Sequence, residues 1–123
     1  MTDKATDAGP PEFATFYDFF SFYLAAHANP TCRKLHYIGT TLATGVFLTA
    51  LLSGTWLLLL AAPLIGYGFA WTGHFLFEHN KPAMFGHPLW SLRGDYRMLR
   101  LALMGQLTSL LNDSIRRYGK SAH

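Results

Sequence analysis

Charged residues are scarce in this sequence, and one long segment has none at all. They make up 14% of the 123 residues, whereas hydrophobic residues make up 50%. Soluble domains carry about 25% charged residues, so much of this protein's surface is expected to face something other than water. The uncharged segment, Leu35–Phe77, is 43 residues long and has room for two membrane-spanning helices.

Several other features are missing as well. Cys32 is the only cysteine, which excludes an internal disulfide. The first 11 residues are polar and lack the apolar core of a signal peptide, so we expect a disordered tail there. There is no serine elbow, phosphate-binding loop or nucleic-acid-binding module. We expect a single helical membrane domain at 12–118 and a short C-terminal tail at 119–123.

A Ser-Gly-Thr turn at residues 53–55 interrupts the uncharged segment near its middle and predicts a helical hairpin. At about 1.5 Å per residue, the arms His36–Ser53 and Thr55–Phe77 span roughly 27 and 34 Å, against a hydrocarbon core of about 30 Å. In such a hairpin, positions whose numbers sum to about 110 lie side by side. The sequence therefore predicts that His36 faces His74 at one membrane surface.

Basic residues gather at the open end of this hairpin. Six lie between Arg33 and Arg100, against two acidic residues. By the positive-inside rule this end is cytoplasmic, and lipid headgroups rather than nucleic acids are the expected anionic partners. We therefore expect an integral membrane protein of the bacterial inner membrane or the endoplasmic reticulum. The sequence indicates no oligomeric state.

Two further helices are expected to flank the hairpin. An aromatic stripe at helical spacing predicts the first, from Glu12 to Ala28, and Pro30 ends it. The segment 80–94, with two prolines and two glycines, is expected to be an irregular loop. Asp95 then caps a fourth helix that continues to Tyr118 and lies in the membrane interface or dips into it. The predicted fold is an all-α, four-helix membrane protein with a central transmembrane hairpin.

Histidines point to a metal site at the basic end of the hairpin. All except the terminal His123 are expected there, and the carboxylate of Glu78 lies one helical turn after His74. Histidines combined with a carboxylate and open positions form the sites of non-haem Fe(II) oxygenases, although zinc and manganese suit the same ligands. Alternatively, each histidine is an interfacial residue bonded to backbone or lipid. The candidate ligands are His27, His36, His74 and Glu78, with His79 and His87 in reserve.

Short motifs are spread over the segment 13–111. They are FY at 22–23, HANP at 27–30, LHYIG at 35–39, GHFLFE at 73–78, KPA at 81–83 and SL at 91–92. In combination they resemble a family of small membrane proteins whose fungal member is a 2-hydroxy fatty acid dioxygenase of the endoplasmic reticulum. The resemblance implies an Fe(II)-dependent α-oxidation, in which O2 cleaves a long-chain 2-hydroxy fatty acid to CO2 and an acid one carbon shorter.

The same resemblance implies roles for particular residues. The family's histidines correspond to His27, His36 and His74, and its acidic position corresponds to Glu78. Together with the charge pattern, this suggests that a nearby cation pairs with the substrate carboxylate while the acyl tail lies along the apolar helices. The candidates for that pairing are Arg33, Lys34 and Arg93. The aromatic wall of the pocket is expected from Tyr67 and Trp71.

Two other functions fit the same residues. One is a non-enzymatic membrane protein that binds lipid or a partner and uses its histidines only as interfacial anchors. The other is a b-type haem protein in which two histidines serve as axial ligands. Stoichiometric metal in the purified protein argues against the first, and a colourless preparation argues against the second.

Overall fold

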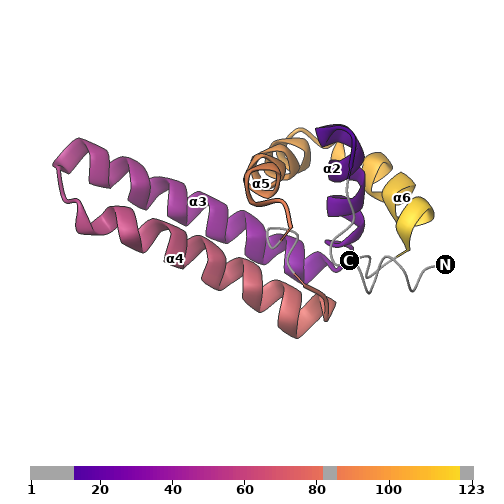
Figure 1. The fold of residues 1–123 in the computed structure, drawn as a ribbon, viewed down its shortest axis with the longest axis horizontal. Coiled ribbons are helices and arrows are strands. Elements are labelled where there is room, and N and C mark those ends of the chain that lie inside the picture. The colour runs from indigo at the N-terminus through magenta and orange to yellow at the C-terminus, as the bar shows by residue number, and fades with distance from the viewer. Residues whose placement is uncertain (1–12, 82–85, 120–123) are drawn as a thin grey trace.

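The computed structural model describes residues 13–81 and 86–119, and all regular structure in these ranges is helical (Figure 1). The all-α prediction is therefore confirmed for this part of the chain. The expected N-terminal tail, and all but the first residue of the C-terminal one, lie outside the described residues. The elements are α2 (Phe16–Ala25), α3 (Pro30–Ser53), α4 (Leu57–Thr72), the π-helix η1 (Gly73–Glu78), α5 (Pro88–Leu103) and α6 (Leu107–Tyr118).

Helices α3 and α4 form the predicted hairpin and lie side by side along their length (Figure 1). The turn is where the sequence places it, because Gly54 ends α3 in the left-handed conformation with φ 71°. At the other end, α3 begins six residues earlier than predicted. Pro30 occupies the first turn, where its missing N–H is harmless, and the Asn29 side chain caps the amides of Thr31 and Cys32.

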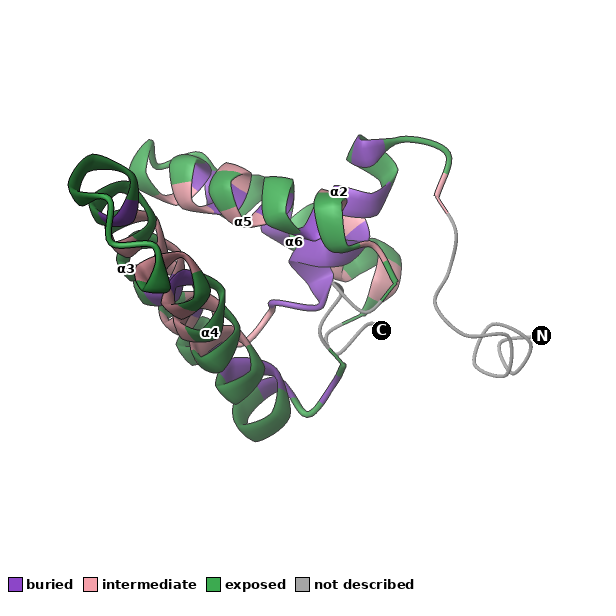
Figure 2. Cartoon of the chain, turned by 60° about the vertical axis from the view of Figure 1, so that its left-hand side comes forward, coloured by how far each residue is buried: buried purple, intermediate pink, exposed green. Residues whose placement is uncertain are grey.

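The hairpin buries little of its apolar surface within the molecule. Its two helical stretches, Pro30–Ser53 and Leu57–Glu78, are long and apolar enough to cross a membrane, yet only 17% of the most apolar window of each is buried. Leu52, Leu57 and Leu64 are each more than 70% exposed. A core helix of a soluble protein is mostly buried, whereas this hairpin is largely exposed (Figure 2).

The other three helices, α2, α5 and α6, form what we call the head. They pack together beside the open end of the hairpin (Figures 1 and 2). Helix α2 supplies six of the ten buried core residues, and these cover more of its circumference than the single expected stripe, since Phe19 and Phe22 are buried and Tyr17 is 59% exposed. One connection to the hairpin is a hydrogen bond between the hydroxyls of Tyr96 on α5 and Thr44 on α3. The buried core consists of Phe16, Phe19, Phe20, Phe22, Tyr23, Leu24, Met98, Leu101, Leu107 and Leu111.

The predicted count of four helices is corrected to five α-helices among the described residues. The expected fourth helix is two helices, because Gly105 adopts the left-handed conformation with φ 71° and turns the chain between α5 and α6. Helix α5 also begins at Pro88, inside the segment expected to be a loop, since proline suits a first helical turn. Asp95 consequently lies within α5 and does not cap its start.

Candidate metal centre

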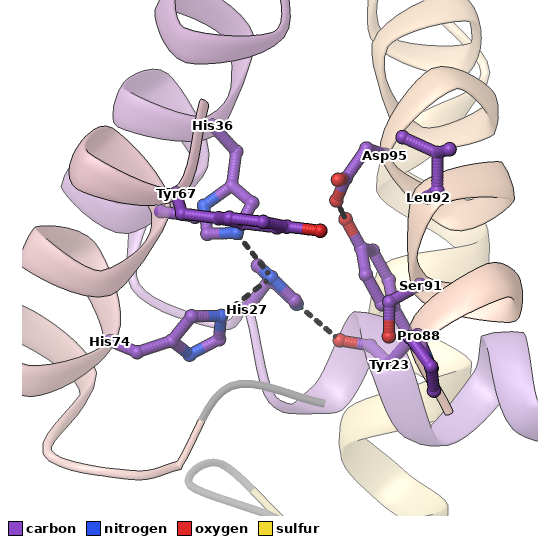
Figure 3. A pocket seen from close by; sticks show the side chains of 10 residues that line it. Tyr23, His27, His36, Tyr67, His74, Pro88, Ser91, Leu92 and Asp95 are labelled. Atoms are coloured by element: carbon purple, nitrogen blue, oxygen red, sulfur yellow. Dashed lines mark hydrogen bonds between the residues drawn. The ribbon is translucent and has the colours of Figure 1, made fainter. Parts of the chain in front are cut away.

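Three histidines from three parts of the chain meet where the head joins the hairpin (Figure 3). His27 lies in the turn after α2, His36 in α3 and His74 in η1. All three are buried, with exposed fractions of 0%, 5% and 1%. The Nε2 atom of His27 is 3.0 Å from that of His36 and 3.0 Å from that of His74. The ring centroids of His36 and His74 are 4.9 Å apart, so the two face each other as the hairpin pairing predicts.

The other ring nitrogen of each histidine is held by a fixed acceptor. Nδ1 of His27 donates to the Tyr23 carbonyl at 2.6 Å, and Nδ1 of His36 donates to the Cys32 carbonyl at 3.0 Å. Nδ1 of His74 donates to Oδ1 of Asn80 at 2.7 Å. The orientation of that amide follows from its Nδ2, which donates to the Ala26 carbonyl at 3.1 Å. Each Nδ1 therefore carries the proton.

This choice of tautomer leaves three Nε2 lone pairs facing one another. The Nε2 acceptor of His27 is in contact with those of His36 and His74, and such acceptors repel each other unless a cation lies among them. Neutral imidazole nitrogens oriented through their far N–H groups are typical metal ligands. A proton does not easily replace the metal, because burial and the neighbouring His36 and His74 hold the pKa of His27 well below its ordinary value. The donor set therefore fits a metal ion bound by His27, His36 and His74.

The π-helix η1 gives His74 its position. It spans Gly73–Glu78 and ends at His79, which adopts the left-handed conformation with φ 61°. The chain then turns so that the amide of Asn80 donates to the His74 carbonyl at 3.1 Å, while its side chain holds the imidazole. Single π-helical turns often occur at functional sites. Sequence reasoning missed Asn80, which it treated only as the start of the expected loop 80–94.

Cys32 is a second residue that sequence reasoning left out of the site. It is fully buried, and its sulfur belongs with the three histidines to a group of ligand atoms that all lie within 4.8 Å of one another. Sγ is 3.8 Å from Nδ1 of His36. The available signal was the spacing of four between Cys32 and His36, which places both on one helix face. Thiolate and imidazole both bind transition metals.

Glu78 lies beside this group and holds the backbone. Its carboxylate is buried and accepts the amide N–H of Asn29, the residue that caps α3. It is not among the ligand atoms within 4.8 Å of one another. The contact ties the end of η1 to the link between α2 and α3, which carries His27. Direct ligation by Glu78 stays a prediction.

The two reserve histidines lie outside the same group. His79 is exposed after the last turn of η1. The ring of His87 stacks on Trp90 with centroids 5.5 Å apart and also contacts Phe19. His87 thus belongs to an aromatic cluster on the head, and His79 lies at the surface.

A small cavity of about 30 Å³ opens on the side of the histidines that faces α5 (Figure 3). The ring of Tyr23 stacks on His27 at 4.0 Å, and its hydroxyl donates to the carboxylate of Asp95. Burial raises the pKa of Asp95 to about 7, against the opposing effect of the Tyr23 hydrogen bond. Of the two aromatic residues expected at the substrate pocket, Tyr67 lines this cavity, whereas Trp71 does not line it and stacks on Tyr67 with centroids 6.0 Å apart.

The basic residues expected at the substrate carboxylate do not line this cavity. Arg33 donates from Nη1 to the carbonyls of His27 and Ala28, at 2.9 and 2.8 Å. Lys34 is exposed. The guanidinium of Arg93 lies 4.0 Å from the centroid of the Phe16 ring in the head. Arg33 therefore holds the turn that carries His27, and Arg93 packs against the aromatic core.

Close contact between α3 and η1 depends on Gly73, which gives a testable prediction. A Cβ atom at Gly73 would lie 2.9 Å from Sγ of Cys32 and 3.2 Å from its Cα, so the Gly73→Ala variant must separate the two helices. We expect loss of bound metal and destabilisation by about 1–3 kcal/mol. Metal analysis and thermal unfolding in detergent measure both effects.

Gly68→Ala is the matched control, because a Cβ there meets nothing within 4 Å. This variant is expected to keep its metal and its stability. If the Gly73→Ala variant bound metal as well as the Gly68→Ala variant, the contact between Cys32 and Gly73 would not position the histidines.

The fold and the site together define a small helical protein with a candidate three-histidine metal centre at the open end of an apolar hairpin. The family model described as 2-hydroxy-palmitic acid dioxygenase Mpo1-like matches residues 13–107, and the chain belongs to this family. The resemblance noted in the sequence is thereby confirmed. The search of curated proteins and the search of solved structures each gave no match.

Proposed function

We propose that this protein is an Fe(II)-dependent dioxygenase that shortens long-chain 2-hydroxy fatty acids by one carbon. The observation that carries the proposal is the convergence of three Nε2 lone pairs, from His27, His36 and His74, in a chain of this family. Bound Fe(II) would supply O2 activation and open positions for the 2-hydroxyl and carboxylate of the substrate. Cys32 and Glu78 are the candidates for further support of the metal.

The proposed reaction balances without any co-reactant other than O2. A 2-hydroxy acid RCH(OH)COOH and O2 give RCOOH, CO2 and water. The bond between C1 and C2 breaks, C1 leaves as CO2, and C2 becomes the new carboxyl carbon. The substrate loses four electrons, and O2 accepts them.

Residues of the cavity would control water and protons during this reaction. The rings of Tyr23 and Tyr67 line the space beside the histidines, and only about 30 Å³ is open there. This space holds about one water molecule, so little solvent fits beside the histidines. Asp95 has a carboxylate in the same cavity with a pKa of about 7, suited to accepting the proton of the 2-hydroxyl at neutral pH.

The proposal includes a membrane location. The exposed apolar hairpin would span the bilayer, with the head and the metal centre at one surface, where the polar group of a fatty acid lies. The basic residues near the open end favour the cytoplasmic surface and contact with anionic lipids. No nucleic acid is involved in this proposal.

The geometry favours one metal ion over the haem alternative. Two axial histidines stand on opposite faces of a haem, with the macrocycle between them. Here the Nε2 atoms of His36 and His74 both lie 3.0 Å from that of His27. Nitrogens this close to that of His27 leave no slot for a macrocycle, whereas a single ion fits beside all three histidines.

The test is turnover by protein purified in detergent. The protein is loaded with Fe(II) without oxygen, then given 2-hydroxypalmitate and O2, and the products are followed by mass spectrometry. We expect the acid one carbon shorter and CO2. Protein that holds stoichiometric iron yet yields no shortened acid from any 2-hydroxy fatty acid would contradict the proposed function, and the non-enzymatic alternative would then be favoured.

A further inference from the structure

A groove of about 340 Å³ continues from the histidine cavity along the hairpin. Five residues line both the cavity and the groove, so the two spaces adjoin each other. From this junction the groove runs to Phe47 on α3 and to Ala62 and Pro63 on α4. The shared residues are His36, Tyr67, Ala70, Leu92 and Asp95.

The walls of the groove are the helix faces that carry the metal-site histidines. On α3, residues 36, 40, 44 and 47 follow one another at spacings of three and four, which keeps them on one face. On α4 and η1, residues 62, 66, 70 and 74 do the same. Helix α5 forms the third wall with Leu92, Asp95 and Tyr96. The groove is thus polar at the histidine end and apolar at the other.

The length of the groove suits a long acyl chain. His36 and Phe47 are separated by eleven residues, which is about 16 Å along the helix. One leaflet of a bilayer has a hydrocarbon thickness of about 15 Å, half of the whole core. A groove along a membrane-spanning hairpin therefore has the reach of a lipid acyl chain.

A buried hydroxyl at the histidine end of the groove has no hydrogen-bond partner within the described part of the protein. Ser91 lines the histidine cavity and is 6% exposed, and its Oγ has no hydrogen-bond partner among the described residues. A buried hydroxyl that has lost its hydrogen bonds to water and gained none is unfavourable. A carboxylate or hydroxyl placed beside the histidines would satisfy it. In Figure 3, Ser91 lies on α5 across the cavity from the histidines.

We propose that this groove binds the acyl chain of the substrate and sets the longest chain that is accepted. The inference rests on the proposed function. The carboxyl group lies near Ser91 and the histidines, and the chain extends between α3, α4 and α5. Phe47, Ala62 and Pro63 line the far end.

Gly66 provides the sharpest test, because packing does not require a glycine there. A Cβ atom at Gly66 would meet only the Cβ of Ala43, at an ordinary contact distance of 3.5 Å. A larger side chain would therefore extend into the groove midway along its length. Gly68→Leu is the matched control, since it adds the same side chain to the same helix where a Cβ meets nothing within 4 Å.

The experiment measures turnover over a series of acids from 2-hydroxyoctanoate to 2-hydroxystearate. In the Gly66→Leu variant we expect kcat/KM for 2-hydroxypalmitate to fall at least about tenfold relative to 2-hydroxyoctanoate, since each buried methylene contributes about fourfold. Gly68→Leu should keep the wild-type profile. Phe47→Ala should shift the preference toward longer chains, and it keeps the proposal testable if Gly66→Leu fails to fold.

Binding of 2-hydroxypalmitate without oxygen separates this inference from the proposed function. If wild-type protein binds the acid and Gly66→Leu weakens binding, the groove is supported even if no turnover is found. If the wild type, Gly66→Leu and Phe47→Ala turn over the acids with the same chain-length profile, the groove does not bind the acyl chain. The proposed function would be unaffected by that result. Ser91→Ala should weaken binding of every acid without changing the chain-length preference, and unchanged binding would overturn the placement of the carboxyl group.

Discussion

Replacing His36 by alanine is expected to leave the purified protein without stoichiometric iron and to lower turnover at least about 100-fold. Loss of a partner that merely orients a metal ligand already lowers affinity 10- to 100-fold, and His36 would supply a ligand atom itself. Its Nε2 is 3.0 Å from that of His27, and its Nδ1 is fixed by the Cys32 carbonyl. Metal analysis and product analysis measure the two effects on one sample.

His79→Ala is the control for this variant. His79 lies near the same end of the hairpin but is exposed and outside the group of candidate ligand atoms. We expect this variant to keep iron and activity. Equal iron content in the His36→Ala and His79→Ala variants would contradict a three-histidine metal centre. The proposed reaction would then lose its main support.

The hairpin and the meeting of its two histidines are predictable from the sequence for simple physical reasons. A charge-free segment long enough for two spans leaves few places to turn, and Gly54 marks the one used. Once the turn is fixed, antiparallel packing determines which residues face each other, so His36 and His74 follow. The position of His27 is predicted less directly, because α2 ends at Ala25 and His27 lies in the turn that follows it.

The remaining parts of the site depend on tertiary structure that spacing does not encode. Asn80 reaches His74 because η1 is a π-helix that ends in a left-handed residue, His79. Arg33 was expected at the substrate, but its guanidinium donates to two backbone carbonyls. Every residue has a backbone carbonyl, so no sequence pattern indicates these partners. The sequence does not reveal that the helix breaks at Gly105. A glycine inside a continuous helix lowers its stability by only about 1 kcal/mol relative to alanine, so a continuous helix was equally compatible with the sequence.

Asp95 shows how one misplaced boundary changes the interpretation of a residue. With a helix start at residue 95, its carboxylate is a cap exposed to water. With α5 beginning at Pro88, the same carboxylate lies within the helix and lines both the cavity and the groove. There it accepts a hydrogen bond from Tyr23, whose ring stacks on His27. Asp95 is thus the acidic side chain placed between the proposed acyl chain and the proposed metal.

Asp95→Asn is therefore expected to lower kcat about 100-fold while leaving the iron content unchanged. General acid–base groups contribute typically 10²- to 10⁴-fold, and an amide cannot take the proton of the 2-hydroxyl. The amide oxygen still accepts the Tyr23 hydroxyl, so the wall of the cavity is preserved. The measurement is single-turnover kinetics on iron-loaded protein, with Tyr23→Phe as the comparison that removes the hydrogen bond and keeps the carboxylate.

The two variants separate a proton-accepting role from a structural one. If Asp95 accepts the proton, Asp95→Asn loses far more activity than Tyr23→Phe, and binding of 2-hydroxypalmitate without oxygen is retained in both. If Asp95 only supports the ring of Tyr23 against His27, the two variants lose similar activity. Loss of iron from Asp95→Asn alone would instead make Asp95 a metal ligand, which contradicts a centre formed without it.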